Sequence, residues 1–129
     1  MNFIELFSAE DNRGTLSAME FQGLPFTPKR IFFISEVPIG SIRGQHAHKI
    51  CEQIIYAIKG SCRLRILTGA SDVTITLDSK SPAVHLHALS WCEISNFETS
   101  TVLAILASHA FDADDYITSL DDFAKELDK

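Results

Sequence analysis

Two histidines stand one residue apart in the stretch 43–53, which reads RGQHAHKICEQ. Side chains at positions i and i+2 of a β-strand point to the same side, so His46 and His48 are expected to face one space. Histidine has an unperturbed pKa of about 6.5 and can accept or donate a proton near neutral pH. The pair is therefore suited to moving protons between adjacent atoms of one substrate.

Polar and basic side chains flank this pair. Arg43, Lys49 and Gln53 suit a ligand site better than a core. Arg63 and Arg65 alternate with apolar residues and share a strand face. They are candidates for ligand contacts, with a solvated outer strand face as the other interpretation.

The same stretch also carries a possible ligand set for a metal. His46, His48 and Glu52 offer donors suited to zinc or iron, and Cys92 offers a thiol. A structural histidine pair without any ligand is a further alternative. The sequence leaves these interpretations open.

A second pair of histidines, His85 and His87, follows the same spacing. These two either join His46 and His48 in one pocket or point outward into solvent. Trp91 is a candidate for stacking on a base or sugar, with a role as a core anchor as the alternative.

The elements that carry these residues show a period of two. Apolar and polar residues alternate, or β-branched residues gather, in segments separated by Gly and Pro turns: 29–35, 53–59, 61–67, 72–78, 84–88, 91–95 and 101–107. Short strands at this spacing are typical of an all-β sandwich or barrel. The segment 101–107 is apolar almost throughout, which predicts a strand buried on both faces.

The end of the chain changes to a helical period. From Asp112 onward, apolar residues recur every three or four positions, and acidic residues gather in the expected first turn. The pattern predicts an amphipathic C-terminal helix that packs on the β body through Tyr116, Ile117, Leu120, Phe123 and Leu127.

Length and charge narrow the functional class. A chain of 129 residues is expected to form a single domain, residues 1–129. The net charge of −6 argues against nucleic-acid binding, and residues 101–129 hold seven acidic and two basic side chains, so the rest is nearly neutral. No apolar run is long enough to span a membrane, no signal peptide is predicted, and the three cysteines favour a reducing cytoplasm.

The spacing His-x-His-x3-Glu-x7-Gly, formed by His46, His48, Glu52 and Gly60, resembles the first motif of the cupin superfamily. The resemblance implies a small jelly-roll barrel. Metal-binding cupins carry a further histidine four residues before an asparagine, and here Cys92 stands four residues before Asn96.

A narrower resemblance covers nearly the whole chain. Several segments are similar to those of the sugar 3,4-ketoisomerases that act on dTDP-4-keto-6-deoxyglucose. They are DNRGTL at 11–16, KRIFFI at 29–34, RGQHAHK at 43–49, and LAS with DDYI near the end. Trp91 and Glu93 match a Trp-x-Glu stretch of that family.

This resemblance implies a cytoplasmic homodimer that needs no metal or other cofactor and binds a dTDP-linked keto sugar. The reaction it implies moves the keto group from C4 to C3 through an enediol(ate), in the biosynthesis of deoxyamino sugars for surface glycans. His46 and His48 are the expected proton-transfer residues. Substrate contacts are expected from Arg43, Lys49, Gln53, Arg63, Arg65 and Trp91.

The chain departs from the family pattern at three places. Phe32 and Phe33 stand where relatives often have tyrosine, the histidines of 84–89 stand where relatives tend to read YIPP, and Cys92 replaces a polar or basic residue. A metal-dependent, dioxygenase-like cupin and a non-catalytic sugar-binding cupin therefore stay as alternatives.

Overall fold

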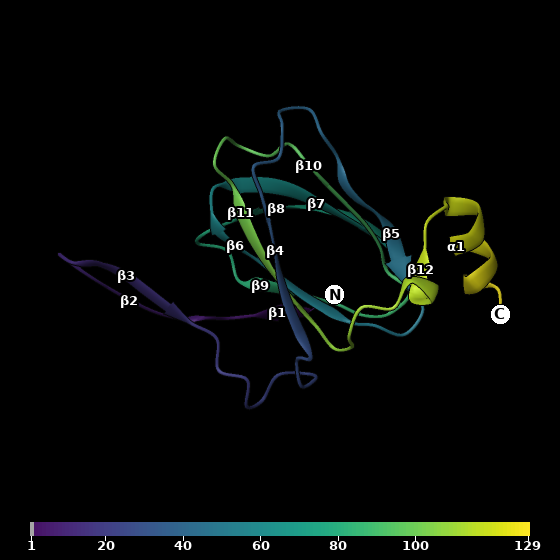
Figure 1. The fold of residues 1–129 in the computed structure, drawn as a ribbon, viewed down its shortest axis with the longest axis horizontal. Helices are drawn as coiled ribbons and strands as arrows, with labels where there is room; N and C mark the ends of the chain where they lie inside the picture. The colour runs from purple at the N-terminus through teal and green to yellow at the C-terminus, as the bar shows by residue number, and fades with distance from the viewer. Residues whose placement is uncertain (1) are drawn as a thin grey trace.

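Two five-stranded sheets face each other in the computed structural model, which describes residues 2–129 (Figure 1). The first sheet has the order β1 (Asn2–Ile4), β9 (Ala83–Leu86), β6 (Gln53–Lys59), β11 (Val102–Ala107) and β4 (Arg30–Ser35). The second has the order β12 (Tyr116–Ile117), β5 (Arg43–His48), β10 (Trp91–Ser95), β7 (Ser61–Leu67) and β8 (Asp72–Asp78). The predicted all-β sandwich with a short C-terminal helix is confirmed.

Alternate side chains of the two sheets form the core between them. Cys62, Leu64 and Ile66 of β7 point inward, as their alternation with Arg63 and Arg65 predicts. Strand β11 lies between β6 and β4, and its residues 103–107 are all buried. The predicted strand buried on both faces is thus observed as an interior strand of the first sheet.

The outer face of the first sheet is only partly covered. Ile54, Ala83 and Leu106 are buried there beneath the segment that contains Met19, Leu24 and Phe26. Along the edge strand β4, the outward side chains of Ile31 and Phe33 stay exposed. This face therefore carries apolar surface that the chain does not bury.

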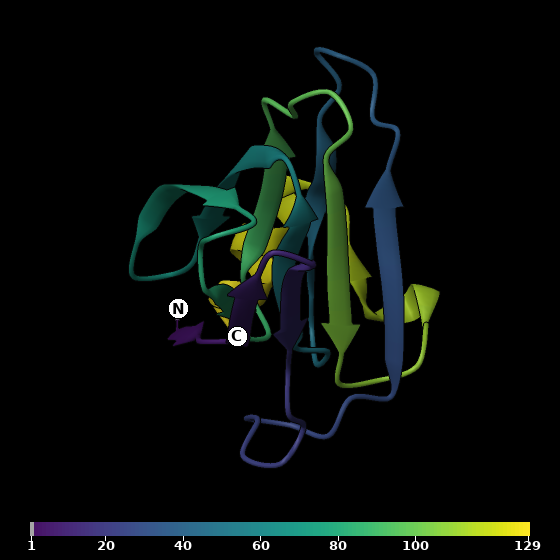
Figure 2. The same cartoon turned by 90° about the vertical axis from the view of Figure 1, so that its left-hand side faces the viewer.

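A separate hairpin projects from the body on the same side of the molecule (Figures 1 and 2). It consists of β2 (Phe7–Asp11) and β3 (Gly14–Ala18), which pair only with each other. All but one of its strand residues are exposed. The hairpin has no core of its own and contributes none to the sandwich.

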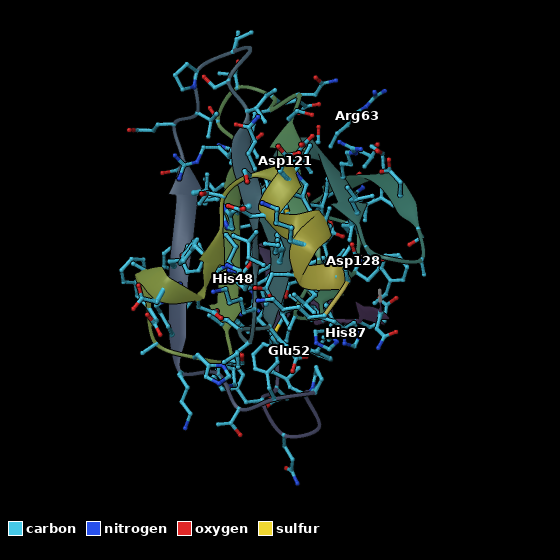
Figure 3. The ribbon with its side chains drawn as sticks, turned by 90° about the vertical axis from the view of Figure 1, so that its right-hand side faces the viewer. His48, Glu52, Arg63, His87, Asp121 and Asp128 are labelled. Atoms are coloured by element: carbon cyan, nitrogen blue, oxygen red, sulfur yellow. The ribbon has the colours of Figure 1, made fainter. Side chains whose placement is uncertain are left out.

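Helix α1 (Leu120–Leu127) covers the outer face of the second sheet (Figure 3). Its buried residue Phe123 packs on Trp91 with ring centroids 5.9 Å apart, and Ser119 caps its N-terminus by accepting from the Asp122 amide. The helix was predicted to begin near Asp112, and this is wrong. Residues Ala113–Asp115 form a single 3₁₀ turn (η1), and the next two residues form strand β12.

The three cysteines are free and buried. Burial raises the pKa of the Cys62 thiol to about 11, which keeps it protonated and unreactive at neutral pH. Among the described residues, no helix has both the length and the apolar character needed to cross a membrane.

Candidate active site

His46 and His48 lie side by side on β5, with ring centroids 5.1 Å apart and the rings nearly perpendicular. Both line the interior between the sheets, beside Gln53, Leu86 and Cys92. Ala47 points the opposite way and is buried against the helix side of the sheet, in the cluster that contains Trp91. The alternation of the strand therefore places both imidazoles in one space, as their spacing predicts.

A carboxylate from the far end of the chain holds His48. Its Nδ1 lies 3.3 Å from Oδ2 of Asp115, a residue 67 positions later. The same carboxylate accepts hydrogen bonds from the amides of Ile50 at 2.8 Å and Cys51 at 3.1 Å, so its position is fixed. Since a carboxylate only accepts, His48 carries its proton on Nδ1, and its buried Nε2 is left as an acceptor without a partner among the described residues.

His46 is held in the same tautomer by a different group. Its Nδ1 lies 3.0 Å from the carbonyl oxygen of Gly44, which can only accept, and its Nε2 is therefore an acceptor. Burial lowers the pKa of His46, and the charge of Arg43 lowers it further. Burial is also the main cause that lowers the pKa of His48, followed by the charge of His46 and opposed by Asp115. Both imidazoles are thus neutral and able to accept a proton near pH 7.

Tyr116 completes this group, and the sequence analysis did not identify it as a site residue. Its ring centroid lies 5.0 Å from that of His46 and 4.4 Å from that of His48. It stands opposite His48 in the pairing of β12 with β5. The helical spacing predicted for this segment obscured it, and only its place in the DDYI motif beside Asp115 pointed toward a functional role.

An open cavity of about 370 Å³ adjoins His46 and Tyr116. Most of its lining residues are apolar, and Arg43 and Gln53 add a charge and an amide. A cavity with an apolar wall and few convergent polar groups is typical of a small-molecule site. Cys92 also lines it, but burial raises the pKa of this thiol to about 12, so it contributes an uncharged side chain.

The phenylalanines that replace tyrosine in the family pattern have different positions. Phe32 points inward and lines the cavity, whereas Phe33 points outward and is exposed. Only the first of these replacements removes a hydroxyl group from the site, where Tyr116 supplies another.

Four predicted substrate contacts lie outside this cavity. Arg65 is on the outer face of β7 and pairs with Asp72 at 2.9 Å and with Glu93 at 3.3 Å. Arg63 is exposed on the same face of β7, far from His48 (Figure 3). The paired carboxylates hold the pKa of Arg65 above its usual value. Trp91 is buried against α1 and donates to Glu93 at 2.9 Å, and Lys49 is exposed after β5. Of the six predicted substrate contacts, Arg43 and Gln53 are the two that line the cavity.

The second histidine pair divides between two surroundings. His85 points away from the barrel interior, because it stands opposite Ile54, whose side chain is buried on the outer face of the first sheet, and it packs near Phe26. Its Nε2 lies 2.7 Å from Oε1 of Glu52. His87 is half-exposed next to it and also lines the small pocket that contains His46 and His48. His85 therefore belongs with Glu52, whereas His87 borders both groups.

This arrangement separates the donors of a cupin-type metal site. The nearest partner of Glu52 is His85, and the Cys92 thiol is held protonated by its burial. Among residues 2–129, the groups of three potential ligands are His48, Cys51 and Asp115, and Glu52, His85 and His87. His46, His48 and Glu52 do not form one, so these residues do not fit the metal centre of that motif.

Comparison with known proteins shows the family of this chain. Residues 1–128 match the family described as FdtA: WxcM-like, C-terminal. The chain belongs to this family. A family member from Aneurinibacillus thermoaerophilus, a TDP-4-oxo-6-deoxy-alpha-D-glucose-3,4-oxoisomerase, is 37% identical over 120 residues, which cover 92% of this chain and 86% of that protein.

Solved structures of family enzymes have the same fold. A 3,4-ketoisomerase from Helicobacter canadensis superposes with a TM-score of 0.92 at 31% identity, covering 99% of this chain and 97% of that one. QdtA from Thermoanaerobacterium thermosaccharolyticum, as a His-to-Asn variant in complex with TDP-4-keto-6-deoxyglucose, gives 0.92 at 29% identity over 98% and 92% of the two chains. The resemblance to the sugar 3,4-ketoisomerases and the cupin-like fold are confirmed.

Proposed function

We propose that this protein is a TDP-4-keto-6-deoxyglucose 3,4-ketoisomerase. The observation that carries the proposal is the pair of neutral imidazoles, each with Nε2 free to accept a proton, beside a cavity of about 370 Å³ in a member of this family. The relative from Aneurinibacillus thermoaerophilus and the QdtA complex support this choice of substrate.

The reaction needs two carbon-bound proton transfers and no net redox change. A base removes the proton from C3, the C4 carbonyl oxygen gains a proton, and an enediol(ate) forms. The C3 hydroxyl then loses its proton to become the new carbonyl, and C4 gains one. We assign the two carbon-bound proton transfers to His46 and His48, and the separation of 5.1 Å between their rings on one face of β5 supports this assignment.

The oxygens that gain negative charge need fixed donors. Gln53 is buried in the cavity wall, and Arg43 lines the same cavity from the start of β5. The Tyr116 side chain lies against both imidazoles. We assign Gln53 and Tyr116 to the sugar oxygens, and Arg43, which is exposed to solvent, to the diphosphate.

The experiment is turnover of TDP-4-keto-6-deoxyglucose in deuterated water, followed by NMR, with His46→Asn and His48→Asn as variants. Each substitution should lower kcat by about 10²- to 10⁴-fold, the usual contribution of one general acid or base. His109→Asn is the matched control because His109 is an exposed histidine outside the cavity. Wild-type activity should persist after chelator treatment.

Failure of the wild-type protein to convert the sugar or to exchange its C3 proton would exclude the proposal. Tight TDP binding without exchange would instead identify a sugar-binding protein. Activity that is lost with a chelator and restored by a metal ion would identify a metal-dependent enzyme.

We also propose that the protein acts as a homodimer in the cytoplasm. The pairing of Phe7 with Ala18 and of Ala9 with Leu16 gives the β2–β3 hairpin one apolar face, while Ser8, Glu10, Thr15 and Ser17 occupy the other. Phe7 and Leu16 are 63% and 59% exposed. A second copy, with its own exposed Ile31 and Phe33 along β4, offers a matching apolar surface. The free cysteines suit a reducing compartment.

A further inference from the structure

Three side chains that the proposed isomerisation does not use meet at one end of the sandwich. Oε1 of Glu52 lies 2.7 Å from Nε2 of His85 and 3.9 Å from Nδ1 of His87. The two imidazole centroids are 4.2 Å apart. Glu52 and His87 lie close together at the lower end of the molecule in Figure 3, away from Arg63 at the upper end.

The backbone holds two of these three residues in place. His85 is 2% exposed and belongs to β9, which pairs with β6. Glu52 immediately precedes β6, and its amide donates to Oγ of Ser108 at 2.8 Å while its carbonyl accepts from the Ser108 amide at 2.9 Å. His87 is the first residue after β9 and is half-exposed.

An isolated ion pair would explain only part of this arrangement. A pair between Glu52 and His85 does not require a second imidazole, yet His87 is directed at the same carboxylate oxygen. Two imidazoles around one carboxylate are the donor set of many zinc sites with an open fourth position. All three donor atoms lie within 4.8 Å of one another.

We propose that Glu52, His85 and His87 bind a divalent transition-metal ion of the zinc class. Zinc ligands stand about 2.0–2.2 Å from the ion, which puts tetrahedral donors about 3.4 Å apart. The observed separations of 2.7 Å and 3.9 Å bracket this value, so small side-chain rotations suffice. Binding replaces the hydrogen bond between His85 and Glu52, and the proton on Nε2 of His85 is lost to water or moves to Nδ1.

The three proposed ligands do not line the cavity of about 370 Å³, although His87 also borders the small pocket that contains His46 and His48. His85 and His87 line a second cavity of about 440 Å³, whose other walls include Thr68, Ser71 and Val73. The fourth position of the metal can be filled from that side by water or by a small anionic ligand. A bound ion would also fix β9 to the segment that leads into Gln53.

The test is equilibrium dialysis of the chelator-treated protein against zinc, with metal content measured by mass spectrometry. We expect about one zinc per chain, and at least a tenfold weaker affinity in both His87→Ala and Glu52→Gln. His87 is half-exposed, so its replacement should leave the fold intact. His109→Ala is the control and should bind as the wild type does.

Cobalt substitution identifies the ligands independently. A site of two imidazoles and a carboxylate should show visible d–d bands without a thiolate charge-transfer band. The proposal is overturned if the wild type binds no zinc, if His87→Ala binds unchanged, or if a thiolate band appears. A thiolate band would assign the metal to the group that contains Cys51.

Discussion

The two site histidines differ in the group that holds Nδ1. A backbone carbonyl holds His46, whereas the carboxylate of Asp115 holds His48. A carboxylate stabilises the imidazolium that forms when the ring accepts a proton, and a carbonyl does so less strongly. Asp115 therefore has a positioning role, because it holds the His48 ring and favours the protonated form of this imidazole.

Replacing Asp115 by Asn tests this positioning role. A hydrogen bond to a charged group is worth about 1.5–3 kcal/mol, so we expect kcat to fall roughly 10- to 100-fold while KM changes little. The variant keeps one oxygen, which can accept from the amide of Ile50 or of Cys51 but not of both, because these amides donate to different oxygens of Asp115. Because Asp115 raises the pKa of His48, its loss should move the acid limb of the pH profile downward. A purely structural role would lower the amount of folded protein and leave that limb in place.

The pH dependence of the wild type follows from the lowered pKa values of both imidazoles. A base must be neutral to accept a proton, so the acid limb of kcat/KM should lie below the value of about 6.5 for free histidine. The lowered pKa values also make the stability depend on pH. Below about 6.5 the unfolded chain binds protons that the folded chain does not, so the free energy of unfolding falls as the pH falls. Circular dichroism at each pH separates the two effects, and a limb above 6.5 would contradict the assignment.

At this scale the sequence predicted the histidines but not their partners. The spacing of His46 and His48 is local and is enough to place both on one side of a strand. Asp115 and Tyr116 reach them only through the pairing of β12 with β5 across 67 residues, which no local pattern contains. The same limit applies to Arg65, because its partner Glu93 stands on the neighbouring strand β10.

Strand β5 depends on one glycine next to the histidines. Gly44 has a φ of +81°, and a Cβ there would lie 2.7 Å from the carbonyl oxygen of Cys92. It stands where the register between β10 and β5 shifts, between Cys92 and Glu93. Its own carbonyl accepts from His46. This backbone conformation therefore sets the orientation of the His46 ring.

Gly44→Ala should lower both stability and activity. The added methyl group must displace backbone in a conformation that already costs about 1–2 kcal/mol for a residue with a side chain. We expect a fall in Tm of several degrees together with a lower kcat. Gly40→Ala is the matched control, because Gly40 also has a positive φ, +87°, and has open space around it. Equal effects of the two substitutions would show that strain alone, without the contact to Cys92, is responsible.

Most strands could be predicted at the scale of elements, and the helix start could not. The alternation in 61–67 corresponds to β7, because one face of that strand is buried and the other is not. From Asp112 the helical spacing is real, but Tyr116 and Ile117 are drawn into the second sheet and Asp115 caps the loop after β5. Tertiary contacts thus outweigh the local period, and the helix begins only after Ser119.

The whole molecule leaves apolar surface uncovered on the hairpin and along β4. Burying a phenylalanine is worth about 1.5–3 kcal/mol, and a two-fold assembly counts each contact twice. Leu16→Glu and Phe33→Glu should therefore convert the proposed dimer into monomers, measured by light scattering on a sizing column. Ser17→Glu is the control, on the polar face of the same hairpin. A wild-type protein that elutes as a monomer would refute the dimer.

At the scale of the whole molecule, the distribution of charge could be predicted from the sequence, whereas the apolar surface available for assembly could not. The acidic excess of residues 101–129 could be predicted directly from the sequence, and most of these carboxylates are exposed around η1 and α1. The projection of the hairpin depends on how β1 and the segment after β3 leave the body, which composition and period do not encode.

The pairing of β5 with β12 also determines when the site can form during synthesis on the ribosome. His48 is synthesised 67 residues before Asp115, and at roughly 5–20 residues per second this interval lasts about 3–13 s. During that time the imidazoles exist without the carboxylate and the tyrosine that orient them. A chain that ended before this point would carry the RGQHAHK stretch but would lack the carboxylate that holds His48.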